Sequence, residues 1–89
     1  MKHQFRQAFN ALKKIGAPVY ERSDIEQFQI SAEHNFDDQY GGELWADFYD
    51  AQNLDGWNFG VNPKIDNILR RYNLHCEWIN AGELGVYED

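Results

Sequence analysis

Hydrophobic residues recur at helical spacing near the start of the chain. They occupy the relative positions i, i+3, i+4, i+7 and i+10 at Phe5, Ala8, Phe9, Leu12 and Ile15. Polar and basic residues lie between them, so one face of a helix would be apolar and the other solvated. Gly16 suits the left-handed conformation that often follows a helix, and Pro18 prevents its continuation. The pattern predicts an amphipathic helix over residues 5–15.

A second helix is predicted over residues 63–72. Asn62 is a favoured N-cap residue, and Pro63 fits the first helical position. An apolar stripe follows at Ile65, Ile68, Leu69 and Tyr72. Arg70 and Arg71 fall in the last turn, where positive charge is favourable, and Asn73 can end the helix in the left-handed region.

Alternating apolar and polar residues predict strands in two regions. Residues 74–80 and 84–88 alternate on either side of the turn at 80–83, which predicts a β-hairpin. Residues 27–33 have the pattern of a half-buried strand, and residues 18–21 could pair with it as a short additional strand. Ser23 and Glu26 have the spacing of a capping box, which predicts a single helical turn at 23–26.

Residues 35–60 have the least regular pattern and are interrupted by glycines. Within them, residues 43–50 fit either element. Alternation places Leu44, Ala46 and Phe48 on one face, whereas helical spacing groups Leu44 and Trp45 with Phe48 and Tyr49. We favour the helix. Taken together, the patterns predict an α+β fold in a single compact domain over residues 1–89, with two helices packed on a small, mainly antiparallel sheet of three to four strands.

Composition excludes several classes of protein. The chain has 89 residues, 16% of them aromatic, and a formal net charge of −7. Its single cysteine, Cys76, excludes an internal disulfide framework. There is no run of 18 apolar residues and no apolar leader segment, so we expect a cytoplasmic protein without a membrane partner. The negative net charge argues against direct binding of nucleic acid.

The charges are segregated along the chain. Residues 1–22 have a net charge of +4, residues 23–62 have nine acids and no Lys or Arg, and residues 63–89 have a net charge of −2. An acidic surface of this kind favours a basic partner protein, including one that binds nucleic acid, whose phosphates the carboxylates would imitate. The alternative is a solvated acidic face that keeps a small protein soluble.

Nine residues of this acidic segment are candidates for binding a partner. The candidate charged residues are Asp37, Asp38, Glu43, Asp47, Asp50 and Asp55. The candidate aromatic anchors are Trp45, Tyr49 and Trp57, because large aromatic side chains are frequent hot spots of interfaces. Each of these aromatic residues is equally a candidate for the core.

No motif for catalysis or metal binding is complete. An EF-hand loop beginning at Asn35 would need Gly at its sixth position and Glu at its twelfth, where the chain has Tyr40 and Ala46. The potential zinc ligands lack zinc-site spacing: His3, His34, His75 and Cys76. We therefore assign no catalytic residue, metal ligand or cofactor. An alternative stays open, in which the acids of residues 33–50 serve a small enzyme or a metal-dependent accessory subunit.

Three stretches of the chain resemble small uncharacterised proteins encoded by phages and prophages. They are residues 15–21 (IGAPVYE), residues 45–50 (WADFYD), and residues 62–65 (NPKI) taken together with residues 77–87 (EWINAGELGVY). The resemblance implies no activity and transfers no functional residue. It implies a setting in the host cell, where small acidic phage proteins often inhibit host machinery. A homo-oligomeric phage structural or assembly protein is the alternative that it leaves open.

Overall fold

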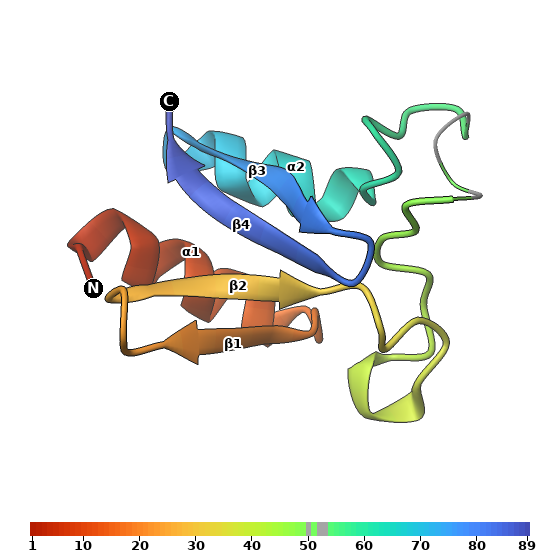
Figure 1. The fold of residues 1–89 in the computed structure, drawn as a ribbon, viewed down its shortest axis with the longest axis horizontal. Coiled ribbons are helices and arrows are strands. Elements are labelled where there is room, and N and C mark those ends of the chain that lie inside the picture. Colours follow the sequence, from red (N-terminus) through yellow and green to blue (C-terminus); the bar gives the residue numbers. More distant parts are fainter. Residues whose placement is uncertain (50, 52–53) are drawn as a thin grey trace.

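The computed structural model describes residues 1–49, 51 and 54–89, and it contains two α-helices and one four-stranded sheet (Figure 1). The elements in chain order are α1 (His3–Lys14), β1 (Val19–Arg22), β2 (Gln27–Ser31), a 3-10 turn η1 (Asp38–Tyr40), α2 (Pro63–Arg71), β3 (Leu74–Asn80) and β4 (Glu83–Glu88). Two helices on an antiparallel sheet form an α+β fold, which confirms the predicted fold class.

The sheet joins two hairpins. Its strand order is β1-β2-β4-β3, and every neighbouring pair is antiparallel. The β1–β2 pairing includes the short additional strand that the sequence predicted, and the β3–β4 hairpin is confirmed. Across the centre of the sheet, Gln29 of β2 pairs with Gly85 of β4. This order makes β1 and β3 the two edge strands.

Both helices cover the same face of the sheet (Figure 1). They run antiparallel, since the side-chain amide of Gln4 near the start of α1 donates to the Tyr72 carbonyl at the end of α2 at 3.3 Å. The core lies between this layer and the sheet. Phe28 of β2 meets the rings of Phe5 and Phe9 edge-on, with centroids 6.4 and 5.4 Å apart. Edge-to-face contacts of this kind are the favoured geometry of buried aromatic rings.

The predicted start and end signals of α2 are confirmed. The Asn62 side chain accepts a hydrogen bond from the Lys64 N–H at 2.9 Å, and Pro63 occupies the first helical position of α2. Asn73 follows α2 with a left-handed φ of 59°. The first helix ends at Lys14 and its last residue in the predicted stripe, Ile15, lies beyond the helix and is exposed.

Two local predictions are wrong. Residues 23–26 form the turn of the β1–β2 hairpin instead of a helical turn, because Glu26 takes a left-handed φ of 53° that returns the chain into β2. Residues 43–49 form neither the favoured helix nor a strand: within them, Ala46 makes one isolated bridge to Val61. Residue 50, the last of the predicted element, lies outside the described residues. The backbone of 43–49 is held by side chains, as described next.

Candidate functional site

Residues 32–49, 51 and 54–62, here called the acidic lobe, lie between β2 and α2 at one end of the molecule (Figure 1). The lobe is built around Trp45, whose side chain is 0% exposed. The indole N–H of Trp45 donates to the Tyr40 carbonyl at 2.8 Å. A fully buried indole stabilises the fold by its large apolar area, about 150–250 Å². Of the two roles that the sequence left open for Trp45, an anchor for a partner or a residue of the core, this burial fits the core.

One asparagine joins the two halves of the lobe. The Asn35 side-chain amide donates to the Ala46 carbonyl at 2.7 Å and to the Ala32 carbonyl at 3.3 Å. Its Oδ1 accepts from the N–H groups of Trp45 at 2.8 Å and Ala46 at 3.2 Å. These bonds replace the ladder that a helix or strand would supply, since buried backbone groups must find partners somewhere. Asn35 therefore explains why residues 43–49 are irregular but ordered.

Asn62 closes the lobe onto α2. Its side-chain amide donates to the Leu44 carbonyl at 2.9 Å, and its own N–H donates to the Trp45 carbonyl at 2.9 Å. Close by, Gly60 adopts a left-handed φ of 80° and approaches Asp47 so closely that a Cβ atom would overlap the Asp47 carbonyl oxygen. A residue with a side chain would not fit there without moving the backbone. The acidic lobe is thus a folded unit with defined contacts.

The lobe brings five of the six predicted carboxylates, Asp37, Asp38, Glu43, Asp47 and Asp55, to one end of the molecule. Glu43 pairs with Lys64 at 2.7 Å, and Asp37 lies 3.4 Å from the His34 ring nitrogen. Asp38 and Asp55 are exposed, and neither pairs with a Lys or Arg among the described residues. Asp47 accepts a hydrogen bond from the Tyr49 N–H at 2.9 Å, which orders the turn. The sixth predicted carboxylate, Asp50, lies outside the described residues.

Exposed aromatic rings accompany these carboxylates. Tyr49 is 75% exposed, as its prediction as an anchor requires, whereas Trp57 is half-buried. Two further aromatic residues of the acidic segment are exposed: Phe59, at 68%, and Phe48, whose ring meets Trp78 of β3 edge-on with centroids 5.3 Å apart. The glycines around Phe59 indicated a loop, but no local pattern shows which aromatic residue of a loop turns outward.

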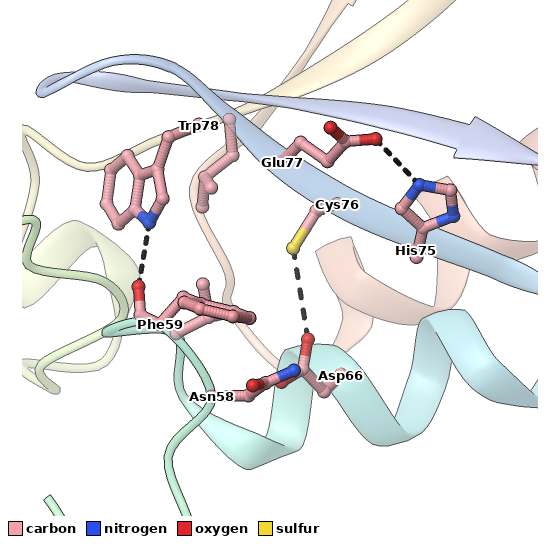
Figure 2. Close-up of a pocket in the computed structure, with 9 residues that line it drawn as sticks. Asn58, Phe59, Asp66, His75, Cys76, Glu77 and Trp78 are labelled. Atoms are coloured by element: carbon pink, nitrogen blue, oxygen red, sulfur yellow. Dashed lines mark hydrogen bonds and ion pairs between the residues drawn. The ribbon is translucent and has the colours of Figure 1, made fainter. Parts of the chain in front are cut away.

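A groove of about 420 Å³ runs between the acidic lobe, α2 and β3 (Figure 2). Phe59 and Val61 line it from the lobe, Asp66 from α2, and the four successive residues 75–78 from β3. The indole N–H of Trp78 donates to the Phe59 carbonyl at 2.7 Å and joins the end of β3 to the lobe. The close-up shows this link on one side of the groove and His75 on the other.

The base of the groove contains a carboxyl group and a thiol. The Cys76 thiol donates to Asp66 Oδ1 at a distance of 3.8 Å (Figure 2). Burial raises the pKa of Asp66 above its usual value, and burial together with the charge of Asp66 raises the pKa of Cys76 to about 12. The thiol is therefore protonated at neutral pH, and nucleophilic chemistry needs the thiolate. Cys76 acts here as a small apolar side chain.

His75 lines the groove between two carboxylates. Its Nε2 lies 2.8 Å from Glu77 Oε2, and its Nδ1 lies 2.7 Å from Asp89 Oδ1. Hydrogen bonds to Glu77 and then to Asp89 raise the pKa of His75. Both ring nitrogens can donate only in the imidazolium form, so the two carboxylates favour the charged ring.

The part of the chain described by the structure holds no group of three or more His, Cys, Asp or Glu side chains that could bind a metal ion. None of its helices is long and apolar enough to cross a membrane. What the arrangement offers is an acidic surface with exposed aromatic rings, beside a mainly apolar groove. These are features of a binding surface.

Comparison of the sequence with protein-family models, with curated proteins and with solved structures finds no match.

Proposed function

We propose that this protein is a non-enzymatic interaction module whose acidic lobe binds a basic surface of a partner protein. The resemblance to small phage proteins suggests the setting, an inhibitor of a host protein that binds nucleic acid. The observation that carries the proposal is the concentration of carboxylates on an ordered lobe that contains no Lys or Arg. An ordered acidic surface can steer a basic partner and hold it without paying for folding on binding.

The distribution of ion pairs supports this proposal. At the end of the molecule away from the lobe, Lys2 pairs with Glu88 at 2.6 Å and Arg22 pairs with Asp24 at 2.8 Å (Figure 1). On the lobe, Glu43 is paired with Lys64, but Asp38 and Asp55 have no cationic partner within the described ranges. Two carboxylates at the far end are thus paired with a Lys or Arg, whereas Asp38 and Asp55 of the lobe are not paired with any cation that the structure describes.

Exposed rings supply the second part of the mechanism. Tyr49 and Phe59 project from the lobe, and both are more than half exposed. Charge complementarity accelerates the encounter and selects the partner, whereas burial of aromatic side chains supplies most of the affinity at typical interfaces. Tyr49 remains a proposed anchor, and we propose exposed Phe59 as the second anchor instead of buried Trp45.

Two matched charge-reversal variants test the proposal. The lobe variant combines Glu33→Lys, Asp38→Lys and Asp55→Lys, three exposed residues of the lobe. The control variant combines Asp24→Lys, Glu26→Lys and Glu88→Lys, exposed residues at the other end, and it changes the net charge equally. Exposed ion pairs contribute little to stability, so both variants should fold. Circular dichroism checks this.

The assay is capture from a bacterial lysate at several salt concentrations, with bound proteins identified by mass spectrometry. We expect basic proteins that the parent and the control variant retain, that the lobe variant loses, and that salt releases. Duplex DNA should displace them if their nucleic-acid site is the one occupied. Equal capture by the lobe variant and the parent would show that the acidic lobe is not the contact.

A further inference from the structure

The outer edge of β3 is open in the described part of the chain. The strand order β1-β2-β4-β3 pairs β3 with β4 on one side and with no described strand on the other. Along such an edge, alternate residues direct N–H and C=O groups outward without a partner. Proteins usually shield an edge strand of this length, Leu74–Asn80, or use it for binding.

The groove described above follows this edge. Neighbouring side chains of a strand point to opposite faces of the sheet. Cys76 and Trp78 of β3, together with Leu84 of β4, which pairs with Trp78, line the groove from the face of the sheet that α2 covers. His75 and Glu77, the alternate residues of β3, line it as well, so the groove extends to the outer edge of this strand. Phe59 of the lobe lines the groove opposite β3, and Asp66 of α2 lies at its base (Figure 2).

The lining of the groove combines apolar surface with charged groups, among them His75, whose ring is paired with Glu77 and Asp89. Phe59, Val61 and Trp78 contribute apolar surface, and Cys76 adds a protonated thiol. Asp66 lies at the base, and Glu77 is exposed at the rim. An occupant that complements this lining has apolar side chains on one face and positive charges on the other.

We propose that the groove binds an extended basic segment of the partner protein, which adds to the sheet as a strand beside β3. The backbone of the segment would pair with the open edge at Leu74–Glu77, up to the point where the Trp78–Phe59 hydrogen bond joins β3 to the lobe. Its apolar side chains would enter the groove. Its Lys or Arg side chains would face the opposite side of the sheet, where Glu77 lies.

This inference rests on the proposed function in one respect, the positive charge of the partner. Charge also selects a basic segment over a second copy of this chain as the occupant. Each copy has a net charge of −7, and two copies joined at β3 would bring the carboxylates of both grooves together. Like charges across an interface oppose association.

The test uses synthetic peptides as probes of the unmodified protein. The first is the acetylated and amidated heptapeptide KVKVKVK. Two derivatives carry N-methyl groups on all valines or on all lysines, and each therefore blocks one edge of the peptide while the charge and side chains stay the same. The peptide EVEVEVE serves as the charge control. Binding is measured by fluorescence anisotropy of labelled peptides, and its position by NMR of backbone amides.

We expect KVKVKVK to bind, with one N-methylated derivative weakened by at least about tenfold and the other nearly unchanged, because strand addition uses one peptide edge. EVEVEVE should bind at least about tenfold more weakly. The amides of residues 74–78 should shift and become protected from hydrogen exchange, whereas those of the other edge strand, β1 (Val19–Arg22), should not. Equal binding of all three basic peptides, no binding of KVKVKVK, or pairing at β1 would overturn the inference.

Two further results separate this inference from the proposed function. If the lobe variant loses its partner but KVKVKVK does not bind β3, the result supports binding by the acidic lobe and contradicts strand addition at β3. If KVKVKVK pairs with β3 while the lobe variant captures its partners as the parent does, the result supports strand addition at β3 and contradicts binding by the acidic lobe. A dimer in analytical ultracentrifugation, with protected β3 amides in the absence of peptide, would identify a second copy as the occupant and overturn the proposal of a basic segment.

Discussion

Replacing Asn35 with alanine should destabilise the acidic lobe more than any other exchange of a single polar side chain for alanine there. The Asn35 side chain makes four hydrogen bonds to backbone groups, two as donor and two as acceptor. Each contributes about 0.5–1.5 kcal/mol net, and the groups left without a partner add to the loss. We expect Asn35→Ala to cost about 3 kcal/mol, a large part of the roughly 5–15 kcal/mol that stabilises a small domain.

Two measurements report this loss. In a domain of this size, about 3 kcal/mol corresponds to a decrease in Tm of roughly 10–20 °C. If the lobe opens without global unfolding, NMR exchange of the Trp45 indole N–H detects it, because this group is bonded to Tyr40 inside the lobe. The same energy corresponds to roughly a hundredfold faster exchange. Asn10→Ala, at an exposed position of α1, is the control. Stability within about 0.5 kcal/mol of the parent, with unchanged indole exchange, would refute the reasoning.

Three other predictions concern individual groups. With the pKa of Cys76 at about 12, the thiol should react with DTNB at pH 8 at least about a hundredfold more slowly in the native chain than in guanidinium chloride, and equal rates would contradict its burial. Because folding raises the pKa of His75, its stabilising effect is complete below the unfolded pKa, about 6.5, and is lost as pH rises through the folded pKa. His75→Gln should therefore lower the free energy of unfolding more near pH 5 than near pH 9, and a difference that does not vary with pH would count against this. Gly60→Ala should destabilise the fold in urea by about 1–3 kcal/mol more than Gly56→Ala, since both have positive φ but only at Gly60 would a Cβ meet backbone, that of Asp47; similar losses would exclude the steric argument.

Local patterns were sufficient for the helices and hairpins. Asn62 and Pro63 define the start of α2 through the hydrogen bonds and φ angles of the first turn, and the structure shows them in those roles. Alternation likewise identified β3 and β4 and the turn between them. Helix caps and strand alternation can be recognised in the sequence because the interactions behind them join residues only a few positions apart.

The sequence predicted the charged residues of the candidate site but not the contacts that its side chains make. The presence of many carboxylates in the lobe can be counted directly in the sequence. Tyr49 is exposed, as a residue that contacts a partner must be. Trp45 and Phe59 have similar loop surroundings in the sequence, yet one is in the core and the other is exposed. No periodicity distinguishes them, because burial in an irregular segment depends on which distant residues cover each ring.

The sequence by itself thus determined the regular elements and the excess of negative charge between β2 and α2. The tertiary structure alone decided the conformation of residues 43–49, where hydrogen bonds from Asn35, across 10 and 11 positions, replace those of a helix. It also decided that β3 lies at an edge beside a groove. Both depend on contacts between residues far apart in the chain, which hydrophobic spacing and capping preferences do not record.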